Sequence, residues 1–422
     1  MDLKRNIGFM GASFLVLNGL IGAGIFALPA KMAATLGAAS PWIFLLFGAL
    51  MLSIVWCFGQ LATHLHRTGG PTVYSEAAFG RFAAFQTGWL YYLARSTAIA
   101  ANMHVLLLYA GYVWPQLQLP MGEVTAILVL SLLLFVVNVT GVRRAIRTLD
   151  AITVLKLLPF LLLIGVGWYQ MPSRPLAIEL PELGTLGTGA LLTLYAFIGF
   201  ETVVVTSGET QRPARTIPRA LMLTVIAIAV FYCLVQYVYW QVMGPLPPDD
   251  APLIALANAL FGPVGAMIMT LTAVVSVAGN LLANSISTSR LTFAMAQEGT
   301  LPAILARIHP RFATPDVSIG LLCVFAAVMA VSGSFVWLAI ASVLARLLVY
   351  AICILALLKL QRQWPGSRSV TSRVTRYLIP VLALVTCGWS VAQSDQQAWW
   401  FLVGECVVGA VLYGVFTRKR HQ

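Results

Sequence analysis

The sequence has little charge and no recognisable set of reactive side chains. Charged residues make up 9% of the 422 positions, and the stretches between apolar runs are too short for a soluble domain. The six cysteines are isolated within apolar segments, without the C-x-x-C spacing or the neighbouring histidines of metal sites. No nucleophile, acid and metal ligands converge in a motif. The sequence therefore argues against a polytopic membrane enzyme, and we expect neither a metal nor another cofactor.

Long apolar runs are what the chain has in quantity. Hydrophobic residues make up 59% of it, in runs of about 20 residues, the length of a helix that crosses a bilayer. This pattern predicts an all-α polytopic membrane protein with one transmembrane domain over residues 1–422, in contact with lipid. A window of about 19 residues gives twelve spans. They are 10–30, 42–62, 84–112, 124–142, 151–170, 188–208, 220–243, 264–289, 317–335, 336–358, 377–394 and 398–416.

The basic residues lie between the apolar segments. A net charge of +12 would suggest nucleic-acid binding in a soluble protein, but these residues are placed as cytoplasmic anchors are, so no nucleic-acid partner is expected. If the N-terminus is cytoplasmic, the outside loops hold only Lys31 and Arg174. The asymmetry predicts that both termini are cytoplasmic in a bacterial-type inner membrane. Nothing in the sequence indicates an oligomeric state.

Two of the predicted spans look interrupted. The first carries Gly22 and Gly24 at its centre, and the sixth carries Gly199 before Glu201. Backbone without helical partners costs several kcal/mol per group in hydrocarbon, so an unwound stretch persists only where it lines a cavity or binds a ligand. A pair of interrupted helices in matching halves points to a transporter with a substrate site at the membrane midplane.

Three loop motifs identify a family. The segment 67–80 contains Gly-Gly-x-x-x-Tyr and resembles the signature after the second helix of the amino acid, polyamine and organocation (APC) superfamily. The segments 208–220 and 289–302 resemble that superfamily's loops after helices six and eight. Together with the Gly-x-Gly of the first span, these motifs occur in the expected order over most of residues 8–360.

The resemblance implies a five-plus-five inverted repeat, the leucine-transporter-like fold. Its halves would be about 8–170 and 188–358, with peripheral helices at about 377–416. It also implies a secondary active amino acid transporter that works by alternating access. An exchanger, an exporter or a polyamine transporter has the same architecture, and a channel is the alternative from another class.

The resemblance also places the substrate at the two interruptions. Helix N-termini attract anions and helix C-termini attract cations, so each break can bind one end of a free amino acid. The amides expected to hold the α-carboxylate are those of Ala23, Gly24 and Ile25. The carbonyls expected to hold the α-ammonium are those of Leu20, Tyr195 and Ile198.

Other residues at the breaks have two interpretations. Glycine at 22, 24 and 199 lets the backbone approach a ligand closely, or serves helix packing. Tyr195 matches an aromatic residue that closes over substrate in relatives. Phe200 lines the same cavity or packs in the core.

Several ionisable residues lie within predicted spans. Lys156 matches a helix-five lysine of sodium-independent members, whose ammonium takes the place of sodium. It either exchanges a proton during transport, which would make protons a second partner, or acts as a fixed cation, which suits an exchanger. Glu201 is expected to be functional or paired. Arg346 either pairs with Glu201 or faces a water-filled path.

Helices three and eight are expected to set specificity. Arg95, Ile99 and Asn102 have the spacing of one helix face, and Asn284 matches a pocket position of relatives. An arginine with two amides favours an acidic or amide side chain and opposes a basic one. The alternative is that Glu201 neutralises Arg95 and leaves a pocket for neutral amino acids.

Overall fold

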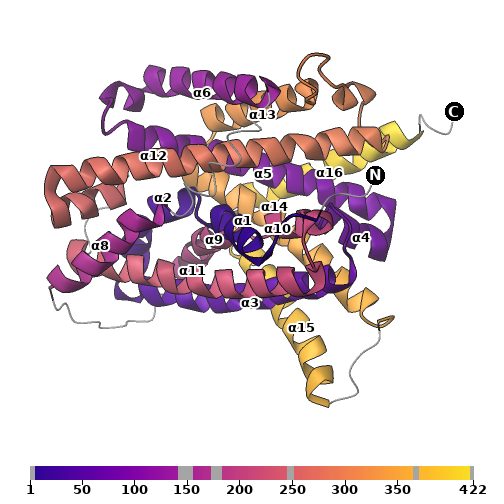
Figure 1. The fold of residues 1–422 in the computed structure, drawn as a ribbon, viewed down its shortest axis with the longest axis horizontal. Helices are drawn as coiled ribbons and strands as arrows, with labels where there is room; N and C mark the ends of the chain where they lie inside the picture. Colours follow the sequence, from indigo (N-terminus) through magenta and orange to yellow (C-terminus); the bar gives the residue numbers. More distant parts are fainter. Residues whose placement is uncertain (1–4, 141–154, 173–182, 245–250, 365–369, 419–422) are drawn as a thin grey trace.

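The described residues form helices joined by short non-helical segments. The computed structural model describes residues 5–140, 155–172, 183–244, 251–364 and 370–418, and these ranges contain no strand. Figure 1 shows the arrangement of the helices. They are α1 Phe9–Leu20, α2 Ala23–Leu36, α3 Ser40–His64, α4 Pro71–Phe79, α5 Arg81–Ala110, α6 Pro120–Thr140, α8 Leu157–Gln170, α9 Leu183–Phe197, α10 Thr202–Val205, α11 Pro213–Met243, α12 Pro252–Gln297, α13 Asp316–Ser332, α14 Phe335–Leu360, α15 Val370–Ala392 and α16 Gln396–Arg418.

Many of these helices can cross a membrane. In hydrocarbon every backbone polar group needs an internal partner, which an apolar helix provides. Among the described residues, seven helical stretches have the required length and composition: Ala23–His64, Pro120–Thr140, Pro213–Met243, Pro252–Gln297, Phe335–Leu360, Thr375–Ala392 and Gln396–Thr417. Four shorter apolar helices accompany them: Phe9–Leu20, Leu157–Gln170, Leu186–Phe197 and Asp316–Ser332. Part of the predicted span 151–170 lies outside the described residues.

The other helices pack around two pairs of short helices, α1 with α2 and α9 with α10, at the centre of the molecule. α3 runs beside α11 along one edge, and α6 lies beside α13 along the opposite edge (Figure 1). α5 packs between α12 and α14. α1 contacts α10 and α11, while α2 contacts α9. α15 and α16 lie at the periphery, where α15 packs on α3 and α14 and α16 packs on α5 and α14.

Both predicted interruptions are present. α1 ends at Leu20 and α2 begins at Ala23, with Gly22 outside the helical region at φ −106° and ψ −146°. α9 ends at Phe197 and α10 begins at Thr202, and Gly199 between them has φ 109°. Each interruption therefore leaves helix ends facing the interior of the bundle.

Two elements differ from the predicted spans. A nine-residue helix, α4, occupies a segment expected to be a loop, with Pro71 in its first turn, where proline needs no hydrogen-bond partner. α12 extends well beyond the predicted span 264–289 and changes direction at Gly262, which has φ 68° and precedes Pro263. The hydropathy window missed both because each element starts outside the most apolar run.

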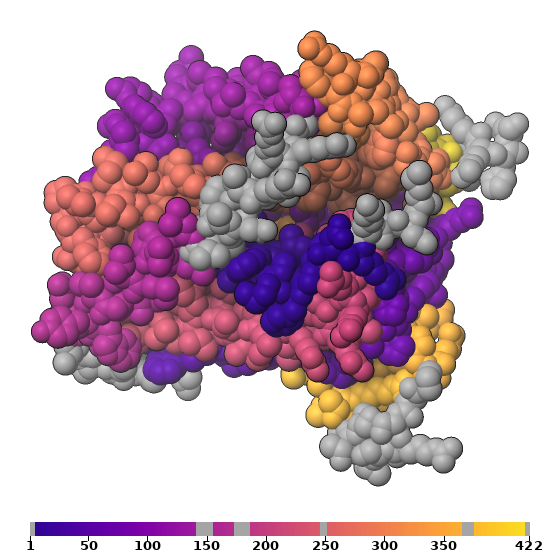
Figure 2. All heavy atoms as spheres, viewed as in Figure 1, coloured from indigo at the N-terminus to yellow at the C-terminus, as the bar shows by residue number. Residues whose placement is uncertain are grey.

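The N-terminal segment is attached to the loop after α10. The amide of Ile7 donates to the carbonyl of Glu209 at 3.1 Å, and the amide of Gln211 donates to the carbonyl of Ile7 at 2.8 Å. Figure 2 shows the indigo N-terminal residues on this face of the molecule against the rose-coloured segment that contains this loop. Backbone hydrogen bonds therefore link the segment before α1 to the loop after α10.

Candidate functional site

The two interruptions line one cavity. It has a volume of about 1070 Å³, and its wall includes Gly22 and Gly24 of the first break and Gly199 of the second. The predicted site residues on its wall are Leu20, Gly22, Ala23, Gly24, Arg95, Asn102, Tyr195, Ile198, Gly199 and Asn284. Those buried outside its wall are Ile25, Ile99, Lys156, Phe200 and Glu201. Phe200 packs against Phe58 and Tyr350, so its place is in the core.

The cavity continues from the breaks towards the loops after α3 and α12. Its outer part is lined by charged residues of both signs: Arg67, Arg81, Arg290, Glu76, Glu209 and Glu298. Burial raises the pKa of the Glu298 carboxyl, and the neighbouring carboxylate of Glu76 raises it further. The outer part of the cavity is therefore charged, whereas the part between the breaks is lined mainly by backbone, amides and hydroxyls.

The two breaks touch through glycines. A Cβ atom added at Gly19 would lie 2.3 Å from the carbonyl oxygen of Gly199, and one added at Gly199 would lie 2.4 Å from the carbonyl oxygen of Gly19. Only glycine allows this approach, and Gly199 also has a positive φ. Sequence reasoning singled out Gly199 but missed Gly19. A glycine one residue before the end of a half-helix was the available signal.

Gly24 serves packing as well as access to the cavity. A Cβ atom there would lie 3.0 Å from the Cα atom of Ala196, so α2 approaches α9 closely at this point. The first amides of α2 have no partners within the helix because they precede its first full turn. The start of α2 therefore presents donors beside a backbone contact that a larger side chain would break.

The carbonyls at the end of α1 already have partners. The Leu20 carbonyl accepts hydrogen bonds from the Tyr232 hydroxyl at 2.7 Å and from the Gly22 amide at 2.9 Å. Of the three carbonyls predicted to bind an ammonium, that of Leu20 has the least capacity left. Lys156, only 4% exposed, donates to the Ile21 carbonyl and to Oδ1 of Asn18, both at 3.1 Å. Its ammonium thus lies at the C-terminal end of α1, where a cation is favoured.

A chain of amides connects Lys156 with Tyr195. Nδ2 of Asn280 donates to the backbone carbonyl of Asn18 at 3.0 Å, and Nδ2 of Asn102 donates to Oδ1 of Asn280 at 2.8 Å. The Tyr195 hydroxyl donates to Oδ1 of Asn102 at 3.4 Å. Asn18 and Asn280 were not predicted as site residues. Their position within apolar spans was the signal, because polar side chains in membrane helices are usually paired or functional.

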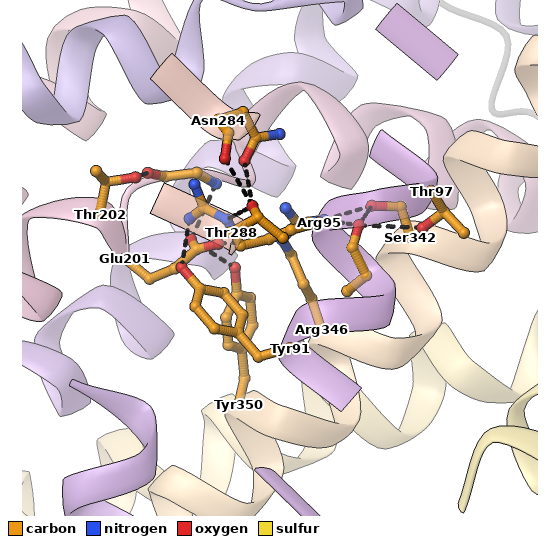
Figure 3. A network of polar contacts seen from close by, with 12 residues as sticks. Tyr91, Arg95, Thr97, Glu201, Thr202, Asn284, Thr288, Ser342, Arg346 and Tyr350 are labelled. Atoms are coloured by element: carbon orange, nitrogen blue, oxygen red, sulfur yellow. Dashed lines mark hydrogen bonds and ion pairs between the residues drawn. The ribbon is translucent and has the colours of Figure 1, made fainter. Parts of the chain in front are cut away.

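Glu201 pairs with Arg346 (Figure 3). Nε of Arg346 donates to Oε1 of Glu201 at 3.0 Å, and the Tyr350 hydroxyl and the Gly199 amide each donate to Oε2 at 2.9 Å. Arg346 also donates to the carbonyl of Ala94 at 2.9 Å. The fully buried carboxylate of Glu201 therefore ties the second break to α14, and Arg346 ties α14 to α5.

Arg95 does not pair with Glu201, contrary to one of the two expectations for it. Its Nε donates to Thr288 at 2.8 Å, Nη1 donates to the Tyr91 hydroxyl at 2.7 Å and Nη2 donates to Ser287 at 2.5 Å. Figure 3 shows Arg95 beside Thr288 and Asn284 of α12. The expected pair is absent because α14 brings Arg346 to the carboxylate.

Comparisons with known proteins identify the family of the chain. A family model described as amino acid permease matches residues 7–410. The chain is 26% identical to the serine/threonine exchanger SteT of Bacillus subtilis, over 90% of this chain and 89% of that protein. It is 28% identical to the human Asc-type amino acid transporter 1, over 91% of this chain and 76% of that protein. It is also 28% identical, along its whole length, to an uncharacterized transporter of Mycobacterium tuberculosis, 94% of which is covered.

Proposed function

Because the chain belongs to the amino acid permease family, we propose that it is a secondary active transporter that moves an amino acid by alternating access. It is a multi-pass membrane protein in a family of amino acid transporters. The observation that carries the proposal is the cavity shared by the two interrupted helices. No chemical change of the substrate and no cofactor is part of this function.

The proposed architecture has twelve membrane crossings arranged as two inverted halves. The halves would be about 8–170 and 188–358, with peripheral helices at about 377–416. The packing supports this arrangement, because each of the first four predicted spans contacts the span at the equivalent position in the other half. The interrupted span α1–α2 contacts the interrupted span α9–α10 (α1 on α10 and α2 on α9), and α3 contacts α11, α5 contacts α12 and α6 contacts α13.

The proposed conformation faces the cytoplasm. The cavity extends towards the basic loops that carry Arg67 and Arg81, which the charge pattern assigns to the inside of the inner membrane together with both termini. The other end is covered by the ring of Phe335, whose centroid lies 5.7 Å from that of Tyr195 and 5.7 Å from Nζ of Lys31. These contacts would have to open for substrate to reach the other side.

In the proposed binding mode the α-carboxylate is held by those first amides of α2 whose residues line the cavity, Ala23 and Gly24. The α-ammonium is held by the carbonyls at the end of α9, those of Tyr195 and Ile198, where the helix end carries partial negative charge. Tyr195 would close over the substrate. Because its hydroxyl is hydrogen-bonded to Asn102, this movement would shift the connected asparagine side chains described above. Lys156, at the other end of this chain, is the proposed coupling residue.

The transport proposal is tested with purified protein in liposomes. We expect saturable counterflow of an amino acid, and we expect Gly24→Leu to abolish it because the leucine would separate α2 from α9 and block the amides. A thermal-shift screen of all amino acids and common polyamines identifies the ligand, because a ligand of the folded state stabilises it. Gly404→Leu is the matched control, since a Cβ atom at Gly404 meets nothing within 4 Å. Wild-type counterflow in Gly24→Leu would contradict the proposed site.

Sodium independence is the second prediction. We expect equal transport in sodium and in choline buffers, because the ammonium of Lys156 already occupies the end of α1. Lys156→Ala is expected to lose net transport, whereas Lys359→Ala, a change at the end of α14, is expected to retain it. A proton gradient would drive accumulation if Lys156 exchanges its proton, and only exchange would be seen if it is a fixed cation. Uptake that requires sodium would show that the role given to Lys156 is wrong.

A further inference from the structure

We infer that Arg95 forms a subsite for a second carboxylate, so that the transported substrate is an amino acid with an acidic side chain. This inference rests on the proposed function and names its substrate class. It starts from the position of Arg95 on the wall of the cavity that the two interruptions share. The guanidinium therefore lies in the same space as the amides and carbonyls proposed to bind the amino acid backbone.

The hydrogen bonds of Arg95 leave part of its guanidinium available. A guanidinium has five N–H donors in a fixed fork that fits a carboxylate. Three of them go to the hydroxyls of Tyr91, Thr288 and Ser287, which are neutral acceptors. Within the described residues no carboxylate oxygen lies within ion-pair distance, and two of the five donors have no partner.

These three hydroxyls also fix the direction of the fork. The Ser287 and Thr288 hydroxyls donate to carbonyls of their own helix, those of Ala283 and Asn284, and so their oxygens are oriented to accept from Arg95. Tyr91 lies one turn before Arg95 on α5. The guanidinium is therefore held in place before a ligand arrives, which reduces the entropy lost on binding.

The charges near the two breaks favour the binding of an anion. Arg346 is neutralised by Glu201, but Arg95 is only 5% exposed and has no such partner in the described part of the chain. An uncompensated buried charge is costly in a membrane protein. The backbone of a free amino acid carries one positive and one negative charge and so adds no net charge. A side-chain carboxylate supplies the missing negative charge, which serine and threonine lack.

The test compares each acid with its own amide. The purified protein is titrated with L-glutamate against L-glutamine and with L-aspartate against L-asparagine, and affinity is measured by competition against a bound radiolabelled amino acid. We expect the wild type to prefer the acid by about tenfold or more, the scale of a hydrogen bond to a charged group. Arg95→Gln is expected to reduce this ratio to about one, and Arg95→Lys to retain part of it. Arg311→Gln, a change at an exposed arginine that is not part of the cavity wall, is expected to leave the ratio unchanged.

The possible outcomes distinguish a failure of the Arg95 subsite from a failure of the transport proposal. If the wild type binds neutral amino acids and shows no preference for acid over amide, the Arg95 subsite is overturned while the transport proposal stands. If no amino acid binds at all, the transport proposal itself fails. If chloride is needed for neutral ligands and replacing it with gluconate has no effect in Arg95→Gln, the anion at Arg95 is free chloride, which also overturns the subsite. The wild-type ratio decides the matter even if Arg95→Gln does not fold.

Discussion

Transport is expected to disappear when a single methyl group is added at Gly19 or at Gly199. In Gly19→Ala the new atom would lie 2.3 Å from the Gly199 carbonyl oxygen, and in Gly199→Ala it would lie 2.4 Å from the Gly19 carbonyl oxygen. Backbone atoms cannot rotate away as side chains do. Gly199→Ala additionally places a Cβ on a residue at φ 109°, which costs about 1–3 kcal/mol in strain. Counterflow in liposomes measures the loss.

Membrane insertion is expected to survive these changes, because neither alters the hydropathy of its span. Gly388→Ala is the matched control, since a Cβ atom there has open space around it. Yield and elution volume after size-exclusion chromatography separate a folded inactive protein from an aggregated one. Near-normal counterflow in both Gly19→Ala and Gly199→Ala would mean that the two breaks need not touch, contrary to the close approach described above.

The second large effect is expected at the ion pair of Glu201 and Arg346. Arg346→Met or Glu201→Gln alone is expected to destabilise the protein by about 3–5 kcal/mol, because each leaves a buried partner group without its counterpart. Arg346→Met combined with Glu201→Gln is expected to recover much of this loss, since neither position of the pair then carries a buried charge without its partner. Thermal unfolding in detergent measures the ranking of the three variants.

Arg307→Gln provides the comparison on the surface. Arg307 pairs with Asp316 and its side chain is 60% exposed, while the Asp316 carboxylate, 9% exposed, keeps a hydrogen bond from the Val317 amide when Arg307 is replaced. We expect a much smaller change in unfolding temperature there than at Arg346. Were the double variant less stable than both single variants, the two residues would be contributing independently and the pair would not explain their burial.

The interruptions could be predicted from the sequence because their cause is local. Glycines in the middle of an apolar span weaken the helix wherever the span is placed, and Gly22 and Gly199 both lie in non-helical backbone. Where the structure describes them, the predicted spans likewise fall on helices or on pairs of half-helices, because apolar runs and helical periodicity are properties of neighbouring residues. The extra length of α12 lay outside such a run and was not predicted.

The partners of the intramembrane charges depended on packing and could not be assigned from spacing. Arg95 and Arg346 were both candidates for Glu201, and only the position of α14 beside the second break decides between them. Asn18 and Asn280 were overlooked for a related reason. An asparagine in an apolar span is recognisable in the sequence, but its role became apparent only when three helices brought several of them together.

The bridge at Ile7 joins the segment before α1 to the loop that follows the second proposed substrate-binding break and α10. α1 is joined to the segment around α10 at both ends, by the Ile7 bridge and by the contact of Gly19 with Gly199. Under alternating access α1 and the segment around α10 would therefore move together, because they are joined at two points. A probe attached next to Ile7 would report the position of these two joined half-helices. A fusion that displaces Ile7 would weaken the contact between them without contacting the substrate.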